Sequence, residues 1–297
     1  MFLFLQQLLG KTEAWRTVRK SIHRIRLIHL FAAVLAVPLM ISSVTLVFAH
    51  PERDAPAAPE QETTRHKHPS KPPSKDLPMP FQVGETLNYR VSWSVFSSAA
   101  SVQLNIPERR GLFGWQTWHF RASAHTLSPA RLLASIDDQY DSYTDSVTLE
   151  SRQFELHVDE MGRKNEQTLY LVAPGQFPRR GISATVVLAD TRDPLGALYA
   201  LRSVDWLNTP EYRAPVFDGR NLFDMRARLE APDEKVAVAA GSYSASRISI
   251  HIYQSGAEVA RSSFVLWLAH DSAHTPVQMQ AELPFANLRV ELTSSSQ

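Results

Sequence analysis

The chain contains no cysteine in its 297 residues. This absence excludes disulfide bonds, thiolate metal ligands, a cysteine nucleophile and a lipid-modified N-terminal cysteine. Exported proteins often carry disulfides, but a domain large enough to bury its own core does not need them. The sequence also lacks a Gly-x-Ser-x-Gly nucleophile elbow. A Ser-His-Asp hydrolase stays open, because such triads are assembled by the fold and not by local sequence.

Long hydrophobic runs are equally scarce, with one exception at residues 30–49. This stretch of 20 uncharged residues would span about 30 Å as a helix, the thickness of the hydrocarbon core of a bilayer. Residues 1–29 contain six Lys and Arg but one acid, Glu13. Because positive flanks stay in the cytoplasm, we expect a single pass through the inner membrane and a periplasmic C-terminal domain. Cleavage near Ala49, as for a signal peptide, stays open as the alternative.

Residues 50–80 predict a tether. The stretch contains eight prolines and almost no large apolar residue, so it cannot bury enough surface to offset the entropy of ordering. We expect a disordered, extended linker. Within it, His66-Lys67-His68 has no third metal ligand nearby, and we interpret the segment as solvated charge.

Residues 81–297 are long enough for one domain. They contain 20 Lys+Arg and 24 Asp+Glu, a net charge of 20 − 24 = −4. The basic character of the whole chain therefore comes from its first 80 residues. A negatively charged domain does not favour a nucleic acid as partner.

The hydrophobic pattern of this domain has a period of two. Leu87, Tyr89, Val91, Trp93 and Val95 alternate with polar residues, as in a half-buried strand. Similar strand-like runs cover residues 100–106, 118–124, 153–159, 167–172, 183–188, 221–229, 244–253, 263–268, 277–283 and 288–292. This pattern predicts an all-β domain with minor α content, in which an antiparallel sheet curls or closes like a barrel.

Helical patterning is limited to two segments. Asp193-Pro194 places a capping side chain before a proline at the first helical position, and apolar residues follow at helical spacing up to Arg202. Residues 127–134 predict one or two further turns. We therefore expect one or two short helices.

Several blocks resemble one bacterial family. Phe81-x-x-Gly84-Glu85-x-Leu87-x-Tyr89-x-Val91-x-Trp93 resembles the opening strand of the DUF3108 family. Further blocks, in the same order, are Ser142-x-x-Asp145-x-x-Thr148-Leu149, Asp193 to Arg202, and Trp267-Leu268 with Asp271 and Pro276-Val277. The chain departs from the family at Ser97-Ser98-Ala99-Ala100, where a Gly-rich segment is usual. The resemblance implies an envelope-attached all-β domain and supplies no catalytic residue.

Motifs for chemistry are weak, and we predict no enzyme, no cofactor and no metal. Gly10-Lys11-Thr12 matches only the end of a P-loop, because Leu5 stands where another glycine is needed. Asp137-Asp138-x-x-Asp141 lies in a strand-like pattern that distributes the acids over both faces, and we interpret them as solvated. His270-Asp271-x-x-His274 is typical of a turn between strands, which would separate the two histidines.

The aromatic residues carry the remaining hypothesis. A curled sheet of about a dozen strands encloses more space than its side chains fill, which favours a lipid or another hydrophobic ligand. We expect Trp93, Trp118, Phe120 and Trp267 to line that space. The alternative is a structural module that docks an envelope protein through its outer surface. The sequence does not decide whether Arg121, Arg202 and Arg226 are ordinary exposed side chains or anchors for an anionic headgroup; exposure is the default.

Overall fold

The computed structural model describes residues 78–93, 96–176, 181–283 and 286–296. The predicted membrane segment 30–49 and residues 50–77 of the predicted linker lie outside this range. No helix among the described residues is long and apolar enough to cross a membrane.

The described residues form one sheet of 13 strands in the order β7-β6-β5-β4-β3-β2-β1-β13-β12-β11-β10-β9-β8. Neighbouring strands are antiparallel except for the short parallel pair β6–β7. The strands are β1 Thr86–Trp93, β2 Phe96–Leu112, β3 Trp115–Thr126, β4 Asp137–Asp145, β5 Ser151–Glu160, β6 Arg163–Val172, β7 Thr185–Val186, β8 Glu211–Phe217, β9 Leu222–Val238, β10 Gly241–Gln254, β11 Ala257–Ala269, β12 Pro276–Leu283 and β13 Ala286–Ser296. The all-β prediction is confirmed, and the sheet curls without closing.

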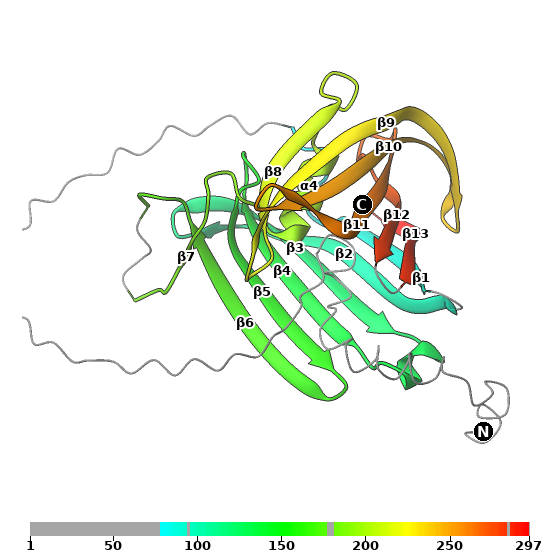
Figure 1. Ribbon diagram of the computed structural model, residues 1–297, viewed down its shortest axis with the longest axis horizontal. Helices are drawn as coiled ribbons and strands as arrows, with labels where there is room; N and C mark the ends of the chain where they lie inside the picture. The colour runs from blue at the N-terminus through cyan, green and yellow to red at the C-terminus, as the bar shows by residue number, and fades with distance from the viewer. Residues whose placement is uncertain (1–77, 94–95, 177–180, 284–285, 297) are drawn as a thin grey trace, which may run out of the picture.

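The two halves of the sheet curl differently. Figure 1 shows β2–β6 spread side by side, whereas the long strands β9 and β10 curve over the other half. The turn after β9 reaches the far side of that half, where the Ala240 amide donates to the Leu292 carbonyl (3.1 Å). The two edges are blunted, since β7 has two residues and β8 contains Pro215.

One face of the sheet holds the core, and we call it the inward face. Paired residues on five successive strands, Ile248, Leu266, Met279, Val290 and Val91, are all buried on this face. Their neighbours along each strand point outward because successive side chains alternate. The alternation seen in the sequence therefore reflects one buried face and one outer face.

Helix α4 (Pro194–Arg202) lies against this core, and every residue from Leu195 to Arg202 is buried. It contacts β3, β4 and β8. The second predicted helical segment contains the 3-10 turn η1 (Ala130–Leu132) between β3 and β4. Both helical predictions are confirmed, whereas the strand predicted over residues 183–188 contains only the two residues of β7.

Candidate functional site

The N-terminus of α4 is fixed by a buried carboxylate. Asp193 accepts hydrogen bonds from the amides of Leu195 and Gly196 (2.9 Å each) and from the hydroxyls of Ser142 and Ser151 (2.5 Å each). Burial raises the pKa of Asp193, and these hydrogen bonds oppose the rise. The carboxyl group thus joins the helix to β4 and β5, which carry the two serines.

A glycine in the first turn permits this close contact. A Cβ atom at position 196 would lie 2.9 Å from Thr144 Cγ2 and 3.0 Å from Ser151 Oγ. Since real Cβ contacts are longer, only glycine lets the helix approach β4 and β5 this closely. Pro194 at the first helical position supplies a favourable φ angle and needs no hydrogen-bond acceptor.

The C-terminus of α4 is fixed by a buried ion pair. The guanidinium of Arg202 donates two hydrogen bonds to the Glu85 carboxylate (2.7 Å each) and a third to the Ala273 carbonyl (2.9 Å). His274 Nδ1 donates to the Arg202 carbonyl (2.7 Å). Arg202 is fully buried, so the default expectation of an exposed side chain is wrong at this position. Its partner Glu85 lies directly before β1, at the start of the described sheet.

Two of the four predicted ligand-binding aromatics meet at this helix. Trp118 and Phe120 lie parallel on β3 with ring centroids 6.3 Å apart, and Phe120 stacks on Tyr199 of α4 at 3.7 Å. Phe81 packs edge-on against all three rings, at 5.1–5.4 Å. We call this part of the molecule the helix end.

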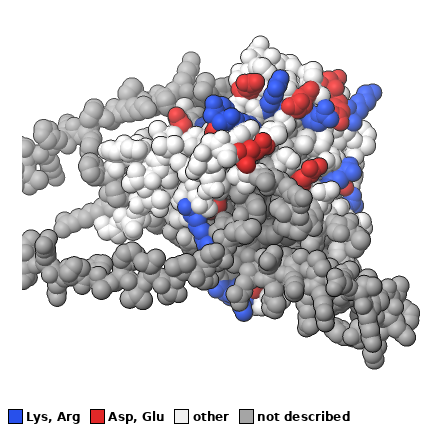
Figure 2. All heavy atoms as spheres, viewed as in Figure 1, with Lys and Arg blue, Asp and Glu red and all other residues white. Residues whose placement is uncertain are grey.

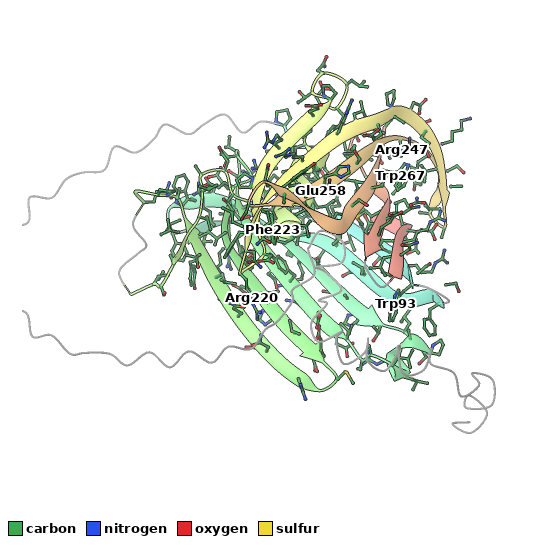
Figure 3. The ribbon with its side chains drawn as sticks, in the orientation of Figure 1. Trp93, Arg220, Phe223, Arg247, Glu258 and Trp267 are labelled. Carbon is green, nitrogen blue, oxygen red and sulfur yellow. The ribbon has the colours of Figure 1, made fainter. Side chains whose placement is uncertain are left out.

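The other two aromatics lie elsewhere. Trp93 ends β1, pairs with Phe96 across the hairpin (6.3 Å between centroids) and lies far from the helix end (Figure 3). Trp267 pairs with Arg247 and Gln278, on the outward face of β11. A ligand that contacts Trp267 would therefore lie outside the inward face. Ligand contact by each of the four residues stays a prediction.

The opposite end of β3–β6 carries large exposed apolar side chains. We define the apolar rim as Leu127, Leu132 and Leu133 between β3 and β4, together with Met161 in the β5–β6 turn. The two connections touch, since the Met161 amide donates to the Ser135 carbonyl (2.7 Å). Sequence reasoning missed this rim, because its residues are scattered over two turns.

Two carboxyl groups lie on the inward face beside the rim. Asp138 is buried and accepts a hydrogen bond from the Asp159 amide (3.0 Å). Burial raises the pKa of Asp138 to about 6. Burial and then the Asp138 charge raise the pKa of Glu160 to about 7. Ionisation of both carboxyl groups at the same time is therefore unfavourable.

The remaining acids of the Asp137-Asp138-x-x-Asp141 motif point outward, so the predicted division between two faces is confirmed. Asp141 is nevertheless buried, and the interpretation of all three acids as solvated is wrong. It accepts hydrogen bonds from His119 (2.6 Å), Arg121 (2.7 Å) and Gln139 (2.6 Å). Burial raises the pKa of Asp141, but these hydrogen bonds outweigh it and hold the pKa below its usual value.

The hydrogen bonds to Asp141 also bear on whether a metal ion could bind beside it. Side-chain ligand atoms of Asp141, Glu155 and His157 lie within 4.8 Å of one another. Both oxygens of Asp141 already accept hydrogen bonds, one of them from the cationic side chain of Arg121. A divalent cation would have to displace the Gln139 amide from one oxygen or the Arg121 guanidinium and His119 from the other, so the residues present do not favour a metal centre.

A serine, a histidine and an acid do come together on β9–β11. Ser246 Oγ lies 3.1 Å from His270 Nε2, and His270 Nδ1 lies 3.8 Å from Asp233. However, the hydroxyl donates its single proton to the Pro232 carbonyl (3.0 Å). The imidazole must then donate to Oγ and cannot act as its base, which is the opposite of a hydrolase triad. His274 turns away to Arg202, as the predicted turn requires.

Surface charge on the described residues is mixed. Figure 2 shows basic and acidic side chains interspersed over the face in view. Arg226 lies over the Tyr253 ring (3.9 Å) and beside Asp224 (2.9 Å), and Arg121 contacts Asp141. These arginines are thus already paired with groups of the chain itself.

Comparisons with known proteins place the chain in a family. The model described as "Protein of unknown function (DUF3108)" matches residues 88–293. No curated protein matches the chain.

Three solved structures are similar to the chain at low scores. A beta-barrel-like DUF1849 protein from Brucella abortus is 12% identical with a TM-score of 0.46, over 71% of this chain and 96% of that one. A lipoprotein candidate from Parabacteroides distasonis is 10% identical with a TM-score of 0.34, over 73% and 97%. An exported-protein candidate with a YmcC-like fold from Bacteroides fragilis is 7% identical with a TM-score of 0.31, over 74% and 98%. At these scores the likeness carries no conclusion about function.

Proposed function

The chain belongs to the DUF3108 family, and from that premise we propose that residues 81–297 bind a lipid or another hydrophobic ligand in the cell envelope without catalysing a reaction. In this proposal, residues 30–49 hold the chain at the inner membrane and the domain lies in the periplasm. The ligand enters at the apolar rim and lies along the inward face toward the helix end.

The observation that carries the proposal is the size of the inward side chains between the two ends. On β2 and β3, between the rim and Phe120, the inward positions include Ala100, Ala122 and Ala124. Alanine occupies far less of the interior than the isoleucine, leucine and phenylalanine at inward positions of the curved half, such as Ile248, Leu266 and Phe264. In the proposal, a hydrophobic chain displaces the side chains that cover these fully buried alanines and lies against them, with Trp93 at the entrance.

The experiment is native mass spectrometry on residues 78–297, exported to a bacterial periplasm and purified without detergent. A discrete adduct that is released on denaturation and identified as a lipid supports the proposal. In Ala124→Leu the larger side chain fills the space, and we expect the adduct to be lost. The control is Ala227→Leu, an equally buried inward alanine on β9. An apo mass that persists after incubation with envelope lipids contradicts the proposal.

A second candidate function has its own support. The rings of Trp118, Phe120, Tyr199 and Phe81 are in direct contact, so the helix end is packed rather than hollow. A packed interior favours a structural module that docks an envelope protein through its outward face. The apo outcome of the experiment above would favour this candidate.

A further inference from the structure

The side chains of the apolar rim are much more exposed than is usual for large apolar residues. Leu132 is 73% exposed and Met161 67%, although they belong to two different connections that touch each other. Leu127 and Leu133 extend the same surface. Four large apolar side chains are thus exposed on two connections that touch each other, and we call this exposed part of the rim the tip.

The charges beside this tip have a consistent arrangement. Arg163 and Lys164 directly follow the Met161-Gly162 turn, and both are exposed. The acids closest to the turn are less exposed, since Asp138 is buried and Asp159 and Glu160 are half-buried, with Asp159 3.8 Å from Lys164. Glu166, two residues further along β6, is exposed. A partner that approaches the tip therefore meets apolar side chains first and then two cations.

An exposed apolar tip with basic neighbours fits the surface of a lipid bilayer. Leucine and methionine side chains enter the boundary between headgroups and acyl chains, while Lys and Arg attract anionic phosphates. A protein partner would need a broad complementary surface of roughly 1,000 Å², and four side chains on two turns offer far less.

The length of the preceding chain permits such a contact. Between Ala49 and the first described residue, residues 50–77 span up to about 87 Å if extended at ~3.1 Å per residue. Strand β2, with 17 residues, is about 56 Å long. The tip can therefore reach the bilayer that holds the predicted segment 30–49, although residue Phe81 lies at the helix end.

We propose that the apolar rim docks onto an anionic phospholipid bilayer, with Leu132, Leu133 and Met161 at the acyl boundary and Arg163 and Lys164 at the phosphates. This inference concerns the surface that receives the domain. It holds whether or not the inward face carries a ligand, and it would bring the alanine-lined strands β2 and β3 to the membrane.

The absence of cysteine makes the test direct, since a single introduced cysteine is the only labelling site. The full chain is reconstituted in phosphatidylethanolamine–phosphatidylglycerol vesicles with the environment-sensitive dye NBD at Leu132→Cys or Met161→Cys. The matched controls are Leu207→Cys, also 73% exposed, and Val186→Cys, 65% exposed, which lie outside the rim. We expect a blue-shifted emission, quenched by spin-labelled lipids, at positions 132 and 161 and at neither control.

A second variant tests whether the two cations beside the tip contribute to docking. Replacing both Arg163 and Lys164 by glutamine should weaken docking about 25-fold at low salt, which is about fivefold for each charge removed. Equal emission and quenching at all four labelled positions would overturn the proposal. So would docking that is unchanged in the double glutamine variant or unchanged in neutral phosphatidylcholine vesicles.

Discussion

Helix α4 is held at its two ends by buried charged side chains that are satisfied in different ways. At the N-terminus, the Asp193 carboxylate has no cationic partner among the described residues and depends on backbone amides and serine hydroxyls. At the C-terminus, Arg202 and Glu85 neutralise each other. A carboxylate that is held only by hydrogen-bond donors tolerates replacement by a neutral amide. When one member of a buried ion pair is neutralised, by contrast, the other is left as an uncompensated buried charge. The variants below test this difference.

The largest effect is expected from halving the ion pair. In Glu85→Gln, the fully buried Arg202 keeps its charge without a counter-ion, and the free energy of unfolding should fall by about 3–5 kcal/mol. The measurement is urea unfolding followed by circular dichroism. Replacing both members, as in Glu85→Leu with Arg202→Met, should recover most of the loss.

The control for this effect is an exposed pair. Arg213 and Asp224 lie 2.7 Å apart on the surface of β8 and β9. Arg213→Met should change the free energy of unfolding by less than about 1 kcal/mol. Equal losses in Glu85→Gln and Arg213→Met would contradict the view that the buried pair fixes the helix.

The N-terminal anchor should discriminate between two substitutions. Asp193→Ala removes the acceptor for two amides and two hydroxyls, and we expect a loss of about 2–3 kcal/mol. Asp193→Asn retains a carbonyl oxygen for the two amides, so its cost should be clearly smaller. Urea unfolding of both variants measures the difference. A loss in Asp193→Asn as large as that in Glu85→Gln would contradict the contrast between the two ends.

The contact beside this anchor predicts a smaller effect. In Gly196→Ala, the new methyl group meets Thr144 Cγ2 and must push the helix away from β4 and β5, at a cost of about 1–2 kcal/mol. Combining it with Thr144→Ser removes the nearest methyl and should restore part of the loss. If Gly196→Ala were neutral or stabilising, the close approach of α4 to these strands would be wrong.

Much of this architecture follows from the sequence, but the helix anchors do not. Alternation from Leu87 to Trp93 and the Asp193-Pro194 start of α4 depend on local physics and were predictable. The Glu85–Arg202 pair joins residues 117 positions apart, which no local pattern encodes. A signal was present, however. Glu85, Leu87 and Tyr89 are spaced two residues apart and therefore lie on the same face of the chain. Arg202 ends a helix that is otherwise apolar. In both cases the pattern directs a charged side chain toward the core.

The candidate site was predictable only in part, for a related reason. Trp118 and Phe120 share a strand face by period two, and they do meet. Trp267 has the opposite parity to Leu266 and Leu268, which alone indicates an outward position. The rim requires two turns to come together through the Met161–Ser135 hydrogen bond, and this contact is tertiary.

The two carboxyl groups beside the rim, Asp138 and Glu160, extend the comparison to pH, because burial raises the pKa of each of them. Their pKa values of about 6 and about 7 in the folded chain exceed the ordinary values of 3.8 and 4.5. These two groups therefore bind more protons in the folded chain than in the unfolded chain between about pH 4 and pH 7, so their contribution to stability rises as the pH falls through this window.

Neutralising one of these carboxyls should remove part of that pH dependence. Asp138→Asn should stabilise the fold at pH 8 by about 1 kcal/mol after allowance for solvent screening, because the variant avoids a charge that burial disfavours. At pH 4 the advantage should disappear, since Asp138 is then protonated in the native chain. Urea unfolding of both proteins at pH 4, 6 and 8 measures this, with the exposed Glu166→Gln as control. A pH-independent difference would show that Asp138 contributes through packing and not through its charge.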